Sequence, residues 1–398
     1  MLRIFLAATL IDALGSGLWV PFALLFLVHG QGMGLVDAGA SLSTGALLAL
    51  VTGPATGAAM DRFGPRALLI AGNLVRLAAF AAYPLAHTSW QVIVVSTVAG
   101  FGDRLFWTCN APMVTRLTSG SDTDRVLATQ TMGRFAGAGI GAAAMAVLPT
   151  ITSPWAFHLL AYGNAASFGV AAVLIRLLPR VAADRAAAAP SGSWRAVLGD
   201  RGFTGFCITH MAFTLASASK FSVLPIVVRD LLHGPQWIAG TAITAGTVVV
   251  VTTQRPIVGL LARRSRTAGL IGAAALFAVC FALLIPLTAV SLPVATALIL
   301  LTSLGFSIAE ALFGPTATAA AAAAAPPGAE GRASSIFQLS WGLPIALAPG
   351  LLATLLSTSN ALTWSILALT CASAVPALLV LRRKLPDALR EPSPPVAA

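Results

Sequence analysis

The chain has 398 residues, of which 57% are hydrophobic and 9% are charged, and its mean hydropathy is +0.88. Soluble globular proteins carry roughly 25% charged residues, so this composition excludes a water-soluble globular fold. The net charge of +11 would suit a nucleic-acid partner only if the basic residues shared one solvated face, and their distribution along the chain excludes that.

Apolar runs of about twenty residues recur along the whole chain, and each is long enough for a helix to cross the ~30 Å hydrocarbon layer. We predict an all-α membrane protein with twelve transmembrane helices. Their predicted ranges are 4–28, 38–59, 67–87, 90–113, 126–149, 155–178, 203–228, 237–261, 267–288, 292–316, 332–356 and 361–381. The first run contains Asp12 and eleven more follow it, so we expect a membrane helix there and not a cleaved signal peptide.

The loops between these runs differ in charge from one side to the other. The N-terminus and every second loop collect Arg3, Arg62, Arg66, Arg116, Arg125, Arg176, Arg180, Arg185, Arg195, Arg201, Arg263, Arg264, Arg266, Arg332, Arg382, Arg383, Lys384 and Arg390, whereas the opposite loops hold only Arg229. By the positive-inside rule, we expect both termini in the cytoplasm and a multi-pass protein of the cell membrane. Trp90, Trp155 and Trp237 fall at the opposite interface, as in an aromatic belt.

The two halves of the chain resemble each other. Pro21, His29 and Gly30 recur as Pro225, His233 and Gly234 at an offset of 204, Gly57 recurs as Gly259 at 202, and Gly102 and Pro112 recur as Gly305 and Pro315 at 203. We therefore predict two pseudo-symmetric six-helix bundles, as in many secondary transporters. The predicted domains are a bundle at 1–178, a cytoplasmic linker at 179–202, a second bundle at 203–385 and a cytoplasmic tail at 386–398.

A glycine-rich motif follows the second predicted helix. It contains Gly57, Asp61, Arg62, Gly64 and Arg66 at a spacing that resembles the signature loop of the major facilitator superfamily. With the twelve helices and the repeat, this resemblance covers almost the whole chain. It implies that Asp61 and Arg62 form a cytoplasmic gate that latches the two halves together. The chain departs from the family pattern at Pro65, and the second-half copy after Gly259 lacks the acid.

The fifth predicted helix contains Gly133, Gly137 and Gly141, which resemble the antiporter motif of drug-exporting members of the superfamily. Ala138 and Ala142 replace the proline and the last glycine of that motif. Glycines four residues apart also let helices pack closely. The spacing therefore fits either an exporter or simple helix packing.

Eight residues of ionisable type lie inside the predicted spans: Asp12, Arg76, Asp103, Arg104, Arg134, Lys220, Arg255 and Glu310. A charge at the bilayer centre costs at least ~2.5 to 3.5 kcal/mol, so such residues usually face a cavity or a partner. The resemblance implies that the first, fourth, seventh and tenth helices line a central cavity, and these four carry five of the eight residues. Arg76 and Arg255 lie outside this set, and we expect structural roles for them.

At an offset of 204, Lys220 corresponds to Ser16, one helical turn from Asp12. We therefore expect an acid and a base at matching depths across the cavity. We propose Asp12 and Glu310 as proton-linked or substrate-sensing acids with Lys220 and Arg104 as countercharges, and Asp103 and Arg134 as further candidates. The alternative is an ion pair that only satisfies buried groups.

Aromatic side chains on the same helices could stack on a lipophilic substrate, although packing explains such spacing as well. The candidates are Trp19, Phe22, Phe106, Trp107 and Trp341. His158 and His210 are isolated histidines in apolar helices, where we expect hydrogen-bonded core residues. The four cysteines lie far apart in the sequence, so no metal ligand set is expected.

The sequence has no Walker loop, HExxH, GxSxG or dinucleotide fingerprint, so we expect neither an enzyme nor a cofactor. We predict a secondary transporter, acting as a monomer in the lipid bilayer, that exports small amphipathic molecules in exchange for protons. The alternatives are an importer or symporter of a small polar metabolite on the same fold, and a receptor or membrane enzyme. The last of these would need a large loop or an added domain.

Overall fold

The computed structural model describes residues 1–117, 154–178, 194–261, 265–327 and 329–390, with individual helical residues between 126 and 143. Within these ranges the regular structure is helical throughout. Ten described helices are long and apolar enough to cross a membrane, and Leu35–Val51 is a shorter apolar helix. The fifth predicted span, 126–149, is helical wherever it is described. The prediction of an all-α membrane protein is confirmed.

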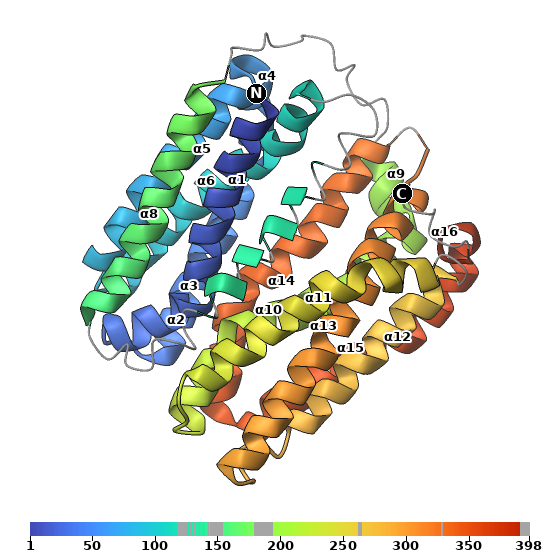
Figure 1. Ribbon diagram of the computed structural model, residues 1–398. Helices are drawn as coiled ribbons and strands as arrows, with labels where there is room; N and C mark the ends of the chain where they lie inside the picture. Colours follow the sequence, from blue (N-terminus) through green and yellow to red (C-terminus); the bar gives the residue numbers. More distant parts are fainter. Residues whose placement is uncertain are drawn as a thin grey trace. The chain divides into compact units, whose positions relative to one another are not determined.

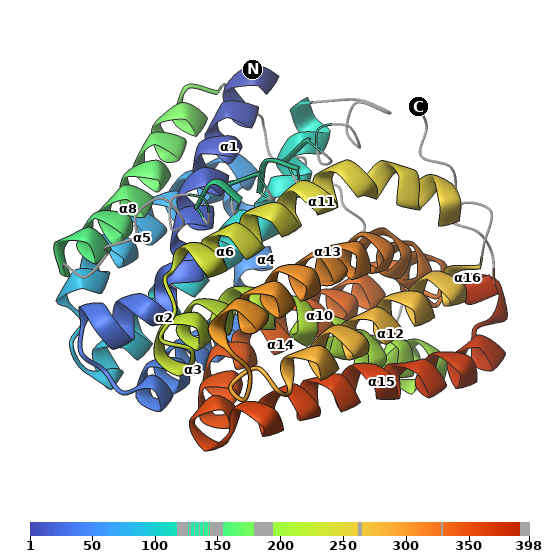
Figure 2. The same cartoon turned by 60° about the horizontal axis from the view of Figure 1, so that its bottom comes forward.

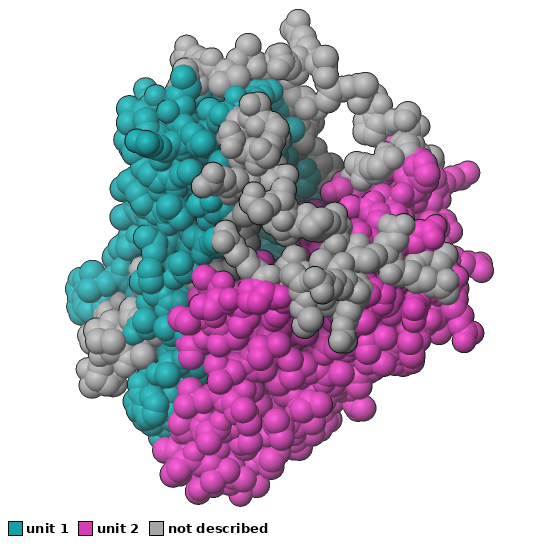
Figure 3. All heavy atoms as spheres, turned by 45° about the vertical axis from the view of Figure 1, so that its right-hand side comes forward, with its two compact units in different colours: residues 1–187, 222–244, 349–354 teal, residues 188–221, 245–348, 355–398 magenta. Residues whose placement is uncertain are grey.

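The chain forms two compact units (Figure 3). Unit 1 contains residues 1–187, 222–244 and 349–354, and unit 2 contains residues 188–221, 245–348 and 355–398. This division differs from the predicted domains, which follow chain order. Segments of the seventh, eighth and eleventh predicted helices belong to unit 1 because their contacts are with the first part of the chain; for example, the Thr244 hydroxyl donates to the Gly139 carbonyl (3.1 Å).

The first helical stretch of unit 1 consists of α1 (Leu2–Trp19), the 3-10 turn η1 (Val20–Phe22), α2 (Ala23–Leu25) and the π turn η2 (Phe26–Gly30). It is followed by α3 (Leu35–Val51), α4 (Gly53–Phe63), α5 (Pro65–Ala82) with the turn η3 (Tyr83–Leu85), α6 (Ser89–Leu117) and α8 (Pro154–Arg176). Helix α1 packs along α8, and α5 contacts both α6 and α8 (Figure 1). Phe5, Leu69, Phe106 and Ile175 are part of the buried apolar cluster of these helices.

The second half begins with α9 (Trp194–Gly199), α10 (Arg201–Ile226), the π turn η4 (Val227–Leu231) and α11 (Trp237–Leu261). It continues with α12 (Arg266–Leu284), α13 (Leu292–Ala323), α14 (Glu330–Thr358), α15 (Asn360–Lys384) and α16 (Pro386–Arg390). In unit 2, α12 packs against α13 and α15 (Figure 2). All four cysteines are buried and free.

The segment 386–398 was predicted to be a tail, and the structure shows that its first residues fold back on the bundle. Helix α16 contacts α12, α13 and α15. The Arg266 guanidinium donates to the Ala388 carbonyl (2.9 Å), and the Thr267 hydroxyl donates to the Leu389 carbonyl (2.8 Å). These donors bind carbonyls at the end of a short helix, which lack partners within the helix itself. Residues 391–398 lie outside the description.

The signature glycine Gly64 has a direct structural explanation. It connects α4 to α5 with φ 76° and ψ 160°, a backbone conformation that only glycine adopts without strain. Pro65, where the chain departs from the family pattern, is the first residue of α5. A proline is well tolerated there because its missing N–H would have no partner in the helix.

The structure corrects the register of the internal repeat in its first helix. Helices α1 and α10 begin at Leu2 and Arg201, and the π turns η2 and η4 begin at Phe26 and Val227, so equivalent positions are separated by less than the predicted offset. That offset of 204 matched Pro21 with Pro225, but Pro21 lies in a 3-10 turn and Pro225 lies inside α10. Lys220 therefore does not correspond to Ser16, and the argument that placed it at the depth of Asp12 was wrong.

Two pairs of elements approach closely through glycines in unit 1. A Cβ added to Gly137 would meet the Ala13 backbone in α1, with its carbonyl carbon at 2.7 Å, and a Cβ on Gly133 would meet the Leu10 side chain. In α5 and α6, a Cβ on Gly72 would lie 2.9 Å from the Gly102 carbonyl oxygen. The antiporter-like motif thus contributes helix packing against α1; its link to export stays a prediction.

We expect Gly137→Ala to lower the melting temperature of the purified protein, because the new methyl group must displace the backbone of α1. Overpacking of this kind costs about 1 to 3 kcal/mol. The matched control is Gly163→Ala in α8, where an added Cβ meets nothing within 4 Å and a better helix former replaces glycine. Thermal melts in detergent compare the two variants. Equal melting temperatures would contradict the close packing at Gly137.

Candidate functional site

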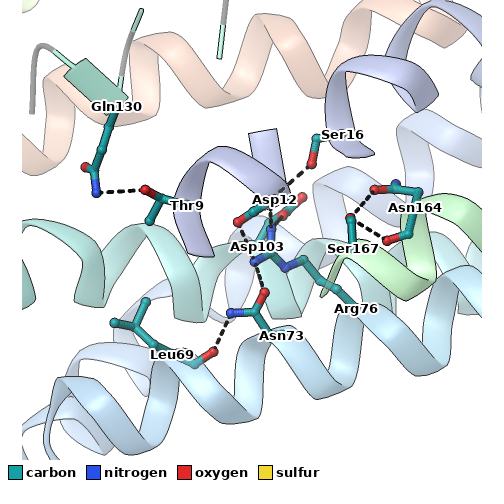
Figure 4. A network of polar contacts seen from close by, with 10 residues as sticks. All are labelled: Thr9, Asp12, Ser16, Leu69, Asn73, Arg76, Asp103, Gln130, Asn164 and Ser167. Carbon is teal, nitrogen blue, oxygen red and sulfur yellow. Dashed lines mark hydrogen bonds and ion pairs between the residues drawn. The ribbon is translucent and has the colours of Figure 1, made fainter. Parts of the chain in front are cut away.

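A buried ion network lies where α1, α5 and α6 meet in unit 1 (Figure 4). Its centre is Arg76, whose guanidinium donates to both oxygens of Asp12 (3.2 and 3.0 Å) and to one oxygen of Asp103 (3.1 Å). Asn73, one turn earlier on α5, accepts a further bond from Arg76 (2.9 Å) and donates to the Leu69 carbonyl (2.8 Å). The four residues Asp12, Asn73, Arg76 and Asp103 are called the ion network below.

Packing explains why Arg76 can lie there. The close approach of Gly72 and Gly102 leaves space for its aliphatic part, since a Cβ on Gly102 would lie 2.6 Å from the Arg76 Cγ. The guanidinium carbon is 4.1 Å from the centre of the Phe168 ring and 4.9 Å from that of Phe106. Two aromatic faces and two carboxylates therefore replace the water that an exposed guanidinium would bind.

The two acids of the ion network differ in exposure. The Asp12 side chain is 1% exposed, whereas the Asp103 side chain is 48% exposed. Ser16 also donates to Asp12 (3.2 Å), so both of its oxygens are bonded. Asp12 is thus a buried partner of Arg76, and Asp103 is the acid of the network that solvent or a ligand can reach.

Two further arginines lie near these acids. Arg134 is within electrostatic range of Asp12 and Asp103 and lies 4.1 Å from the centre of the Trp107 ring. Arg104 is within electrostatic range of Asp103. Asp103 therefore shares its surroundings with three guanidinium groups, two of which are not bonded to Asp12.

Unit 2 contains a separate charged site on α10, α11 and α13, formed by Ser217, Lys220, Gly246, Ser307 and Glu310 and called the lysine site below. Lys220 is 6% exposed, and its ammonium donates to the Ser307 hydroxyl (3.1 Å). Glu310 interacts electrostatically with Lys220 and accepts a hydrogen bond from Ser217. Gly246 is required here because a Cβ would meet the Lys220 ammonium and lie 2.5 Å from the Ser307 oxygen.

The structure corrects the partner expected for Asp12. Its countercharge is Arg76, which sequence reasoning assigned to a structural role outside the cavity helices, whereas Lys220, predicted as a countercharge at the depth of Asp12, interacts with Glu310. The available signal was the pair Asn73 and Arg76, since two strongly polar residues one turn apart on an apolar helix share a face. Whether Asp12 and Lys220 face each other stays a prediction, as they belong to different units.

The predicted gate motif is only partly described. Arg66 donates to the carbonyl of Arg176 (2.6 Å), at the end of α8, where a cation also complements the helix dipole. Arg62 is exposed, and its guanidinium carbon lies 5.2 Å from the centre of the Phe63 ring. Gly57, Asp61 and Arg255 are helical, and the surroundings of these three residues lie outside the description. The latch therefore stays a prediction.

The predicted cavity aromatics fall into two groups. Trp19, Phe22 and Phe106 are buried, at 6%, 2% and 1% exposure, and Trp19 packs against Phe80 with 5.1 Å between ring centres. These three have packing roles in the structure. Trp107 is 51% exposed and Trp341 is partly exposed, so these two rings are the ones a ligand can reach.

A polar contact outside the predicted set joins the two π turns. His29 Nε2 lies 2.9 Å from Asp230 Oδ1, and both side chains are partly exposed. Each residue is the fourth of its turn, in η2 and η4, so the contact joins equivalent positions of the internal repeat. Sequence reasoning had matched His29 with His233 and missed this pair.

Comparison with known proteins agrees with this architecture. Residues 4–349 match the Major Facilitator Superfamily. The chain is 28% identical to "Multidrug resistance protein MdtH" of Yersinia enterocolitica over 227 residues, which are 57% of this chain and 56% of that protein. The same protein of Yersinia pestis is 28% identical over 222 residues, 55% and 54% of the two chains. The chain thus spans about half the length of these relatives.

Solved structures show the same fold. A POT family transporter in complex with a thioalcohol conjugated peptide has a TM-score of 0.77 at 13% identity, with 96% of each chain covered. The nucleoside transporter NupG has a TM-score of 0.69 at 13% identity, with 96% of this chain and 98% of that chain covered. With the helical architecture and a family match over most of its length, the chain belongs to the Major Facilitator Superfamily, as a multi-pass membrane protein.

Proposed function

We propose that this chain is a secondary active transporter that exports small amphipathic molecules in exchange for protons by alternating access. The observation that carries the proposal is the ion network, in which an accessible acid and a buried acid share one arginine. When Asp103 takes up a proton, Arg76 keeps its bonds to Asp12 and Asn73. The network can therefore gain and lose a proton without leaving a buried charge unpaired, which would be costly.

This proposal divides the roles that were expected of the acids. Asp103 exchanges the proton, Asp12 holds Arg76 in place, and Arg134 and Arg104 compensate the charge of Asp103. Glu310 and Lys220 form the second coupled pair, in unit 2. Export is supported by the similarity to multidrug resistance proteins over half of the chain, and by the glycine pattern of the fifth helix. Import of a polar metabolite is the competing outcome of the experiments below.

The first test separates the two acids of the ion network. In everted vesicles, a proton gradient drives accumulation of an amphipathic cationic dye, and we expect Asp103→Asn to abolish this accumulation. The melting temperature of this variant should stay near that of the wild type. Asp12→Asn breaks a buried pair, which costs about 3 to 5 kcal/mol, and should lower the melting temperature strongly. The exposed acid Asp37, substituted as Asp37→Asn, is the control. Full gradient-driven accumulation by Asp103→Asn would refute the assignment.

The second test concerns the lysine site. We expect Lys220→Met and Glu310→Gln each to reduce both transport and stability, because each leaves a buried charge without its partner. The double variant should be more stable than the sum of the two losses predicts, since both charges are gone. Thermal melts of the wild type, the two single variants and the double variant give the coupling free energy between the two side chains. Additive losses would mean that the two side chains do not act as a pair.

The third test uses the contact between the π turns. Alternating access requires the ends of the first and seventh helices to separate during each cycle. We expect a short bifunctional thiol reagent to crosslink the variant His29→Cys/Asp230→Cys and to stop dye accumulation, and cleavage of the crosslink to restore it. The native cysteines are buried, and His29→Cys alone is the control. Undiminished transport by the crosslinked protein would rule out this movement.

A further inference from the structure

An imidazole lies among three aromatic rings in unit 2. The centre of the His210 ring is 4.5 Å from that of Phe337, 5.0 Å from that of Trp341 and 5.2 Å from that of Phe313. The last three residues are called the aromatic cage below. His210 is 2% exposed, Phe313 and Phe337 are buried, and Trp341 is partly exposed. The cage is thus closed on the side of Phe313 and Phe337 and reaches the surface of unit 2 at Trp341.

The hydrogen bonds of Ser340 fix the tautomer of His210. The Ser340 hydroxyl donates its single proton to the Phe337 carbonyl (2.6 Å). Its oxygen, 2.8 Å from His210 Nδ1, must therefore accept there, so Nδ1 carries the proton of the imidazole. In a neutral imidazole the other nitrogen is then an acceptor. His210 Nε2 is consequently a lone-pair acceptor inside the aromatic cage.

This acceptor has no partner in the described structure. His210 Nε2 is buried and makes no hydrogen bond. Buried polar atoms are nearly always hydrogen-bonded, so an exception in a native protein calls for an explanation. A phenylalanine would fill the same space without the unpaired nitrogen. We infer that His210 Nε2 accepts a hydrogen bond from a donor group of a bound ligand.

The aromatic cage and the lysine site lie along the same helices. Ser217, which bonds Glu310, follows His210 on α10 by seven residues. Seven residues are about two turns, or about 10 Å, and they return to the same face of the helix. On α13, Phe313 follows Glu310 by three residues and shares its face. The two sites are therefore the two ends of one strip, apolar at His210 and charged at Lys220 and Glu310.

We propose that this strip is a substrate-binding site whose aromatic cage takes an aromatic ring bearing an N–H or O–H donor, which bonds His210 Nε2. A polar group on the same molecule, separated from the ring by about the rise of two helical turns, reaches the lysine site. Trp341, the partly exposed wall of the cage, moves aside to admit the ring. The inference rests on the proposed transport function and specifies its substrate class as amphipathic aromatic molecules with a hydrogen-bond donor on the ring.

The test compares 2-naphthol with 2-methoxynaphthalene, in which a methyl group replaces the hydrogen of the donor. Equilibrium dialysis measures their binding to the purified full chain in lipid nanodiscs, without a proton gradient. We expect the wild type to prefer 2-naphthol by roughly tenfold, as one hydrogen bond allows. His210→Phe should remove this preference, so that the two probes bind with equal affinity. Trp341→Ala should weaken the binding of both probes by the same factor.

The result that overturns the inference is a preference for 2-naphthol that survives His210→Phe, or no binding of either probe to the wild type. Melting temperature provides the folding control: His210→Phe removes an unpaired buried acceptor, so the variant should be at least as stable as the wild type. Because no gradient is used, the outcome is independent of proton coupling. Binding that is intact in a protein without gradient-driven transport would refute the proposed function alone.

Discussion

Arg76 is among the largest fully buried side chains in the described part of the chain, and its charge requires an opposite charge in direct contact. Removing a guanidinium from water inside an apolar bundle is unfavourable unless its donors are satisfied. Asp12, Asp103 and Asn73 accept the bonds that its terminal nitrogens donate, each from a fixed helical position. The relative placement of α1, α5 and α6 in unit 1 therefore depends on this one side chain as well as on apolar packing.

Unit 2 also contains a buried cation, but its partners differ from those of Arg76. Its buried cation is the compact ammonium of Lys220, which needs only a hydroxyl, a nearby carboxylate and the space left by Gly246. An ammonium has three donors and no planar geometry to match, whereas a guanidinium can hold two carboxylates at once. The two halves of the repeat thus share their helical framework but differ in their ionic chemistry.

The sequence was sufficient to predict the ten described helices of membrane length, because an apolar run of about twenty residues has one stable arrangement in lipid. It did not predict that the second span, 38–59, is divided between α3 and α4. The signature spacing at Gly64 was also recognised in the sequence, and the positive φ of this residue explains its glycine. The partner of Asp12 was not predictable in the same way. Assigning Arg76 required the close packing of α5 against α6 at Gly72 and Gly102, which leaves space for the arginine beside Asp12 of α1. Residue matches alone also misplaced the repeat by several positions, because Pro21 and Pro225 are the same residue type in elements that are not equivalent.

The contact between His29 and Asp230 bears on how a duplicated chain can evolve. A residue that touches its own equivalent lies on the local two-fold axis relating the copies, and in a homodimer such a position always faces an identical side chain. Two histidines or two aspartates would meet there, and like charges repel. Joining the two copies in one polypeptide removes that restriction, because each copy can mutate independently. The contact between His29 and Asp230 joins two different side chains at this axis, which a symmetric homodimer cannot do.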